Sequence, residues 1–174
     1  MRYSFDNISK FKGFDAGEIY LVMFHVDKTP PHLGLVKDNK YCSITIKGVE
    51  MDVDVDTIFN VIKRKRIPTL FVGLNMEGNF DLRSYYQKYS SIIDQNISCL
   101  APIKDVISGE LNLVLKEVHV IFDLLDKLKE KELLKKIAYF NLEDRLNKIG
   151  AFEMKKYGFE ELNEYLDNLR IIRS

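Results

Sequence analysis

A predicted β-hairpin in the first third of the chain limits the possible folds more than any other stretch. Its two arms, residues 33–36 and 41–46, are rich in apolar, β-branched and aromatic residues. Between the arms, Asp38 and Asn39 tolerate the left-handed backbone of a two-residue turn. The sequence therefore predicts an antiparallel strand pair, which makes an antiparallel sheet the expected framework.

The two-residue turn also predicts the register of the hairpin. It pairs Lys37 with Lys40, Val36 with Tyr41, Gly34 with Ser43, and His32 with Thr45. Because side chains alternate across a strand, we expect His32, Ser43 and Thr45 to share one face. Gly34 lies in the middle of that face and leaves room above it.

His32 is the first candidate functional residue. Pro30 and Pro31 cannot continue a ladder of hydrogen bonds, so they mark where its strand begins. An imidazole at a strand end beside small polar groups can act as a general base. The alternative from this hairpin alone is a polar residue that merely starts a strand.

Bulk composition restricts the function classes. The 174 residues suit one domain, or one domain with an extension, and 46% apolar residues supply a core. The formal net charge of +0 gives no electrostatic reason to expect nucleic acid as a partner. Two cysteines make no disulfide framework, and we see neither a signal peptide nor a transmembrane run. We expect a cytoplasmic protein without metal or cofactor.

The elements around the hairpin are predicted from the hydrophobic pattern and from the residues that typically begin or end a strand or a helix. Residues 19–26 are apolar on both faces and predict a buried central strand that contains His25, interpreted as a core or sheet-end histidine. A second strand is predicted at 69–74. The other expected elements are a connection at 49–54, a helix from Asp54 or Asp56 to about Arg66, and a short helix within 80–89. The basic run 63–66 is better explained as the cationic last turn of a helix than as a phosphate-binding site.

Cys99 is the second candidate functional residue. Ser98 is a natural helix N-cap, and Pro102 is tolerated only in a first turn, so Cys99 is expected at a helix start. Such a position favours a thiolate and brings cysteine pKa values down from about 8.5. The alternative is a small cysteine buried at a helix start. Cys42 faces away from His32 in the hairpin and is interpreted as structural.

Helical spacing dominates the last third of the chain. It predicts helices over 117–128, 133–140, 142–149 and 159–172, with His119 on a charged flank of the first. We therefore divide the chain into an α+β domain, residues 1–115, and a helical C-terminal extension packed on it, residues 116–174.

Three features in sequence order carry a resemblance to a known group of enzymes. They are a Gly-acidic-apolar strand, Gly17 to Val22; a His-apolar-Gly-apolar strand, His32 to Val36; and a cysteine at a helix start, Cys99. Over about residues 14–110 the chain resembles the circularly permuted papain-like group. This group includes lecithin:retinol acyltransferase and permuted relatives of the NlpC-type peptidases. The resemblance implies an antiparallel sheet flanked by helices.

The resemblance also implies a chemistry. Cys99 is then the nucleophile and His32 the general base of a hydrolase or acyltransferase for a small acyl or peptide substrate with an amide, ester or thioester bond. The residue that orients the histidine in this group is usually His, Asn, Gln or Glu. Here the position falls on Ser43 by family offset or Thr45 by hairpin register, which leaves a Cys-His dyad or a site that binds without turnover.

Two other function classes remain open from the sequence. One is a non-catalytic papain-like protein that binds a protein partner through its C-terminal helices. The other is a nucleic-acid accessory protein that uses the basic run 63–66, against which the neutral net charge speaks.

Overall fold

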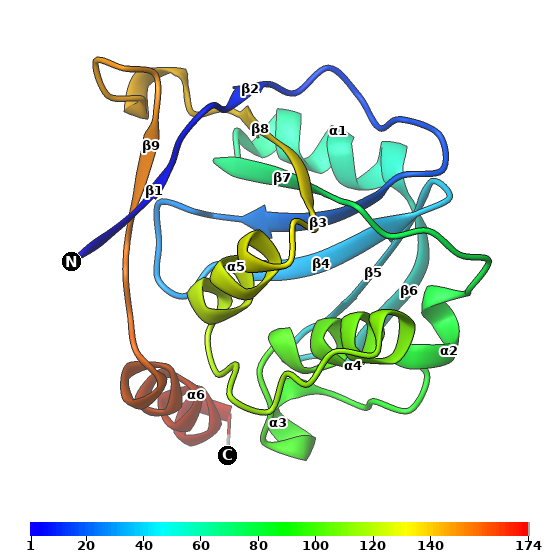
Figure 1. Cartoon of the computed structure of the whole chain (residues 1–174). Helices are drawn as coiled ribbons and strands as arrows, with labels where there is room; N and C mark the ends of the chain where they lie inside the picture. Colours follow the sequence, from blue (N-terminus) through cyan, green and yellow to red (C-terminus); the bar gives the residue numbers. More distant parts are fainter. Residues whose placement is uncertain (174) are drawn as a thin grey trace.

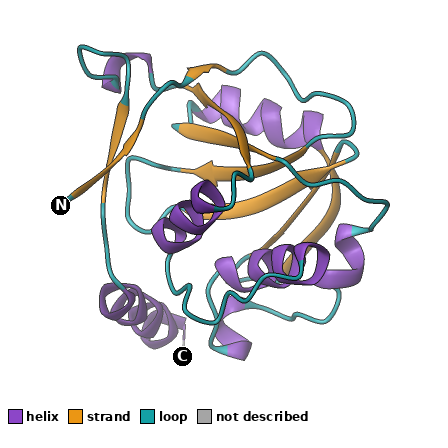
Figure 2. Ribbon diagram, in the orientation of Figure 1, coloured by secondary structure: helices purple, strands orange, loops and turns teal. Residues whose placement is uncertain are grey.

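Seven strands form one sheet, and all but one of its neighbouring pairs are antiparallel. The order across the sheet is β2-β8-β7-β3-β4-β5-β6, and only β2 and β8 run parallel. The structure, a computed structural model, describes residues 1–173, with the backbone alone at Arg173. The predicted α+β class, a mostly antiparallel sheet with flanking helices and a C-terminal helix, is confirmed (Figures 1 and 2).

The strands are β1 (Arg2–Phe5), β2 (Ser9–Lys10), β3 (Ile19–Phe24), β4 (His32–Lys37), β5 (Lys40–Ile44), β6 (Val49–Asp54), β7 (Thr69–Leu74), β8 (Leu134–Phe140) and β9 (Phe152–Lys155). The helices are α1 (Val55–Lys65), α2 (Leu82–Tyr86), α3 (Ile92–Gln95), α4 (Leu100–Leu111), α5 (Ile121–Glu130) and α6 (Phe159–Arg173), with a short 3-10 helix, η1 (Glu143–Arg145).

The hairpin β4–β5 forms with the predicted turn and register. Lys37 pairs with Lys40, Val36 with Tyr41, and Gly34 with Ser43. Asp38 and Asn39 both have positive φ, at 51° and 61°, as a type I′ turn requires. The pairing stops before residue 45, because β5 ends at Ile44. The predicted pair of His32 with Thr45 is therefore absent from the ladder.

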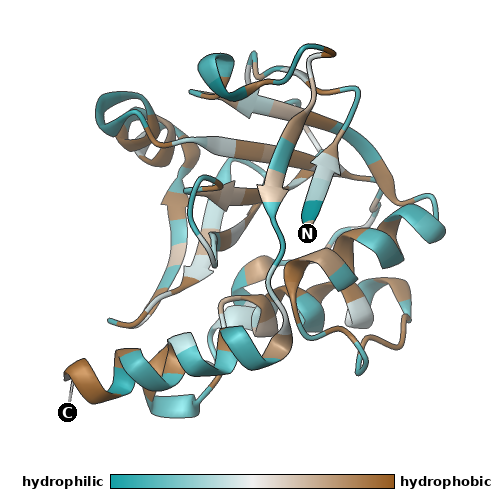
Figure 3. Ribbon diagram, turned by 90° about the vertical axis from the view of Figure 1, so that its left-hand side faces the viewer, coloured by the Kyte–Doolittle hydropathy of each residue, from teal (hydrophilic) through white to brown (hydrophobic). Residues whose placement is uncertain are grey.

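Two apolar layers cover the two faces of the sheet. On one face, β3, β4 and β5 pack with β7 and with α1, whose buried residues Val55 and Ile62 face the sheet. On the other face, α2, α4 and α5 pack against the alternate side chains of the same strands. Figure 1 shows α1 on one side and α4 and α5 on the other. The central strands β3 and β7 are buried throughout, which explains their continuous apolar sequences (Figure 3).

The prediction of an all-helical segment after residue 115 is wrong in three places. Residues 134–140 form strand β8, which pairs with β7, and residues 152–155 form β9, which pairs with β1. The predicted helix at 142–149 is reduced to η1. A seven-residue apolar pattern fits helix and strand alike, and the unpaired backbone edge of β7 decides in favour of the strand. The segment called an extension thus supplies part of the central sheet.

The predicted connection at 49–54 is also a strand, β6, which pairs with β5. The predicted short helix within 80–89 and the helices that begin near residues 55, 100 and 159 are confirmed as α2, α1, α4 and α6. None of the helices in the described part of the chain has the length and apolar character needed to cross a membrane.

Candidate functional site

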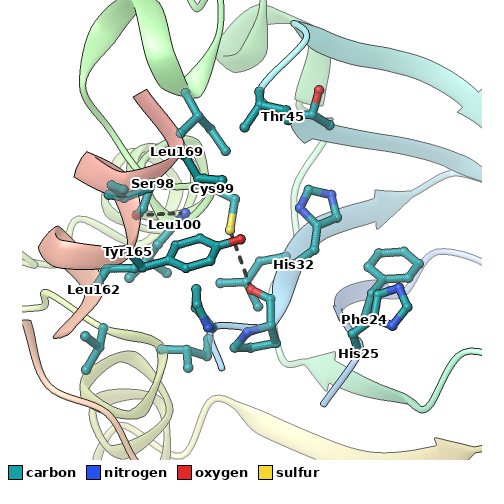
Figure 4. A pocket seen from close by; sticks show the side chains of 18 of the residues that line it. Phe24, His25, His32, Thr45, Ser98, Cys99, Leu100, Leu162, Tyr165 and Leu169 are labelled. Atoms are coloured by element: carbon teal, nitrogen blue, oxygen red, sulfur yellow. Dashed lines mark hydrogen bonds between the residues drawn. The ribbon is translucent and has the colours of Figure 1, made fainter. Parts of the chain in front are cut away.

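Cys99 and His32 line the same cavity, although His32 begins strand β4 and Cys99 precedes helix α4. The cavity measures about 540 Å³ and lies at the start of β4, where the sheet ends. Apolar side chains of β3, α1, α5 and α6 form most of its wall, among them Phe24, Ile58, Val61, Ile121, Leu162 and Leu166. Figure 4 shows the sulfur of Cys99 and the ring of His32 on this wall.

The start of α4 places Cys99 as predicted. Cys99 is the residue that precedes the helix, and the Ser98 hydroxyl accepts a hydrogen bond from the Leu100 N–H at 3.3 Å. Pro102 falls in the first turn, where its missing N–H costs nothing. The Cys99 sulfur donates to the carbonyl oxygen of Pro31 at 3.9 Å, so it rests directly against the backbone that carries His32.

The expected thiolate is absent in the resting site. Burial raises the pKa of the Cys99 thiol to about 11, although the backbone N–H groups of Leu33 and of Cys99 itself oppose this rise. The prediction that the helix N-terminus lowers this pKa is wrong, because the loss of solvent around the sulfur outweighs those N–H groups. At neutral pH Cys99 is a neutral thiol.

His32 is a neutral imidazole at the first position of β4. Burial, together with the neighbouring charge of His25, lowers the pKa of His32 to about 4. Its ring packs against Phe24, with 5.6 Å between the ring centroids. Its Nε2 lies 3.3 Å from the phenol oxygen of Tyr41. An unprotonated imidazole held in this way can accept a proton, which is the first requirement of a general base.

Tyr41 is the site residue that the sequence analysis missed. It pairs with Val36 in the hairpin, and its ring turns along the sheet over Gly34 to reach His32. A Cβ at Gly34 would lie 2.6 Å from both Cζ and the phenol oxygen of Tyr41, a separation that real Cβ atoms do not have. The room predicted above Gly34 is therefore the place of the tyrosine ring. The signal that could have identified Tyr41 is its position in the predicted register, which puts this buried aromatic side chain on the same face as His32.

The two predicted orienting residues have other partners. Thr45 lines the cavity, but its hydroxyl donates to the Gly48 carbonyl at 3.1 Å and accepts from the Lys47 N–H at 3.1 Å. These bonds close the turn that follows β5. Ser43 is fully buried and donates to Glu50 at 3.3 Å. Neither hydroxyl holds the imidazole directly, because Thr45 has left the ladder and Tyr41 lies between Ser43 and His32.

Of the remaining candidates, Cys42 and the basic run take the places expected for them, whereas His25 and His119 lie just outside the strand and the helix predicted to contain them. Cys42 is fully buried in the core on the α4 side. His25 follows the last residue of β3, has a positive φ of 55°, and also lines the cavity. His119 stacks on Phe159 at 4.6 Å between centroids. The basic residues 63–65 form the last turn of α1. Among the described residues, no group of three or more His, Cys, Asp or Glu side chains is arranged to hold a metal ion.

Helix α6 forms one wall of the cavity with a single apolar face. Leu162, Tyr165, Leu166 and Leu169 line the cavity at helical spacing. Tyr165 is 42% exposed, and the exposed Glu50 also lines the cavity, so the cavity reaches the surface near these residues. The apolar face predicted for residues 159–172 is therefore directed inward, toward the candidate site (Figure 4).

Comparisons with protein-family models, with curated proteins and with solved structures find no match to this chain. The site is therefore interpreted from its own geometry.

The raised pKa of Cys99 predicts an unusual alkylation profile. The alkylation rate of Cys99 by iodoacetamide should be low at neutral pH and should still increase above the pKa of about 8.5 of a free thiol, since only the thiolate reacts. Peptide mass spectrometry after timed alkylation at a series of pH values measures this rate. A plateau that begins below pH 8 would contradict it. Cys42, which is buried in the core, is the internal reference.

Proposed function

We propose that this protein is a cysteine-dependent hydrolase or acyltransferase, and that its sheet is a permuted papain-like one. The observation that carries the proposal is that Cys99 and His32 line one cavity. The order of the elements supports it, because the strand with the histidine precedes the helix with the cysteine.

The proposed reaction begins from a neutral pair. His32 takes the thiol proton on the ring nitrogen that Tyr41 leaves unoccupied, while the Cys99 sulfur attacks the carbonyl carbon of the substrate. The imidazolium then gives this proton to the leaving alcohol, amine or thiol, and a thioester remains on the sulfur. Water or an acceptor hydroxyl loses a proton to His32, attacks the thioester, and regenerates the thiol.

Electrostatic coupling within the pair makes this transfer feasible. A thiolate favours the charged form of an imidazole beside it, and the imidazolium favours the thiolate in turn. The backbone N–H of Cys99, at the start of α4, is available to stabilise the oxyanion that forms on the substrate. The pair is therefore expected to ionise as the substrate reacts, rather than beforehand.

The cavity indicates which part of the substrate it would hold. Most of its wall is apolar, and its polar groups, among them His32, Tyr41 and Cys99, gather at the start of β4 and α4. An apolar acyl chain can fill such a space with its carbonyl at the polar end. We therefore favour an acyl ester or thioester over a charged peptide as the substrate class.

A chain-length series of activated esters tests this function. The protein is incubated with p-nitrophenyl acetate, butyrate and octanoate, and both nitrophenol release and the mass of the Cys99 peptide are followed. We expect faster release with octanoate than with acetate, together with a hydroxylamine-sensitive acyl group on Cys99. Acylation of surface lysines alone, with no acyl group on Cys99, would refute the proposal.

A second candidate function is the binding of an apolar ligand without turnover. The raised pKa of Cys99 favours it, because a neutral thiol in an apolar wall is a packing group. Because α6 lines the cavity with its apolar face, the ligand would lie beneath that helix. Saturable binding of octanoate that leaves the esters uncleaved would select this function.

A further inference from the structure

We propose that Glu50 makes the candidate site selective for acyl substrates with a cationic or neutral leaving group, and that it disfavours anionic ones. Esters and thioesters of amino alcohols and amino thiols belong to the favoured class. Acyl carriers that bear phosphate or sulfonate belong to the disfavoured class. This inference rests on the proposed function and narrows its substrate class, although the same preference can be measured by binding alone.

The described part of the cavity wall carries one carboxylate and no permanently charged cation. Among the described lining residues, Glu50 is the only Asp or Glu, and there is no lysine or arginine. The other titratable groups on the wall are phenols, a thiol and imidazoles: Tyr41, Tyr157, Tyr165, Cys99, His25 and His32. His32 is neutral at neutral pH, because burial lowers its pKa to about 4. The permanent charge on this wall is therefore negative.

Strand pairing places the Glu50 side chain on the same face of the sheet as His32. Glu50 in β6 pairs with Ser43 in β5, and Ser43 pairs with Gly34 in β4. Paired residues share a face, and so do residues two positions apart in one strand, such as Gly34 and His32. Oε2 of Glu50 accepts a hydrogen bond from the Ser43 hydroxyl at 3.3 Å, so the carboxylate lies over β5. Neighbouring strands are about 4.8 Å apart, so this charge is one strand spacing from the strand that His32 begins.

No cation of the described side chains neutralises this carboxylate. Within residues 1–172, whose side chains the structure describes, none of the ion pairs includes Glu50. The hydrogen bond from Ser43 occupies one lone pair of the carboxylate and leaves its charge in place. Glu50 is exposed and lines the cavity where the cavity reaches the surface. Its charge therefore acts on any group that enters or leaves there.

The apolar wall and this carboxylate act on different parts of a substrate. In the proposed reaction the acyl chain fills the apolar space between α1, α5 and α6, with its carbonyl carbon at Cys99. The leaving group then extends toward the open end, where Glu50 lies. An ammonium group is attracted there, and a phosphate or sulfonate group is repelled. The carboxylate of a released acid is repelled as well, which favours product release.

Three thioesters that differ only in the charge of the leaving group test this preference. They are the octanoyl thioesters of thiocholine (cationic), 3,3-dimethylbutane-1-thiol (neutral) and 2-mercaptoethanesulfonate (anionic). We expect kcat/KM, measured from released octanoate, to be about 10- to 100-fold higher for the cationic than for the anionic thioester, with the neutral one between them. In about 1 M salt this ratio should fall toward unity, because the Debye length shrinks to about 3 Å. Equal values for cation and anion at low salt would overturn the inference.

Two variants of Glu50 test whether its charge is the cause. Glu50→Gln keeps an oxygen that can accept from Ser43 but removes the charge, so the ratio of cationic to anionic kcat/KM should fall toward unity. Glu50→Lys should reverse the preference. Because Glu50 is exposed, both variants are expected to fold. An unchanged ratio in both variants refutes the role of Glu50.

Glu77→Lys is the matched control, because it makes the same change in net charge as Glu50→Lys at an exposed position that does not line the cavity. Glu77 follows the end of β7 that pairs with Ile19 at the start of β3, whereas the cavity lies at the opposite end of β3, beside Phe24. This variant should leave the ratio unchanged. A shift equal to that of Glu50→Lys would show that only the net charge of the protein matters.

Binding without turnover separates this inference from the proposed function. Isothermal titration of the native protein with octyltrimethylammonium and with octanoate measures the same preference. Tighter binding of the ammonium that is lost in Glu50→Gln, with no acyl group on Cys99 from any thioester, leaves the charge preference standing and refutes the proposed function. Acylation of Cys99 at equal rates by all three thioesters supports the function and refutes the inference. No saturable binding and no acylation would refute both.

Discussion

Replacement of His32 by asparagine is expected to lower ester turnover by about 10²–10⁴-fold, the usual contribution of a general base. Cys99→Ala is expected to leave only the background rate, because no sulfur remains to form the thioester. Nitrophenol release at saturating octanoate ester measures both effects. The two losses should not add in the double variant, because both residues act in one step.

The controls for this result are an imidazole and a thiol outside the cavity. His119→Asn makes the same chemical change at an exposed position just before α5, where the ring contacts Phe159 rather than the site. Cys42→Ala removes the other thiol, which is buried in the core. Equal losses of ester turnover in His119→Asn and His32→Asn would show that the loss does not come from the removal of a general base. Circular dichroism of each variant separates loss of activity from loss of fold.

Gly34→Ala is expected to destabilise the protein by about 1–3 kcal/mol, as small-to-large changes in a packed interior do. The new Cβ would lie 2.6 Å from Cζ and the phenol oxygen of Tyr41, and that side chain is 1% exposed and has no space to move into. The ring must shift, and the contact of its oxygen with His32 is lost. We therefore expect lower stability and lower turnover together, measured by urea unfolding and by ester cleavage.

Gly73→Ala is a matched control in the same sheet. Gly73 lies inside β7, and its new Cβ would meet first the Lys136 side chain, with 3.3 Å to Cγ, which can move toward solvent. This variant should be far less destabilised. In a Tyr41→Val background the obstructing ring is gone, so Gly34→Ala should then cost little. Additive costs of Gly34→Ala and Tyr41→Val would contradict the proposed steric conflict.

Local sequence rules predicted the elements that carry the two main candidates. The pair Asp38-Asn39 was sufficient for the turn and register of the hairpin, because few residues adopt positive φ at two successive positions. Ser98 and Pro102 were sufficient for the start of α4, because capping and proline geometry act within one turn. These signals involve residues a few positions apart, and they placed His32 and Cys99 correctly in their elements.

The polar neighbour of His32 could not be predicted in the same way. The register gives the face of each side chain, but it does not give the direction in which a long side chain turns along that face. The Tyr41 ring crosses over Gly34 because the sheet face around it is closed by α1 and Phe24. The choice of Tyr41 over Ser43 and Thr45 therefore depended on packing between distant segments.

The sequence by itself determined the hairpin, the buried central strands and the position of Cys99 at the start of a helix, since turn chemistry, periodicity and capping are local. The tertiary structure alone decided that residues 134–140 join the sheet as β8 and that the Tyr41 phenol lies beside His32. It also decided that Cys99 is a thiol with a raised pKa rather than a thiolate. The reason is that strand pairing, side-chain direction and desolvation are set by neighbours far away along the chain.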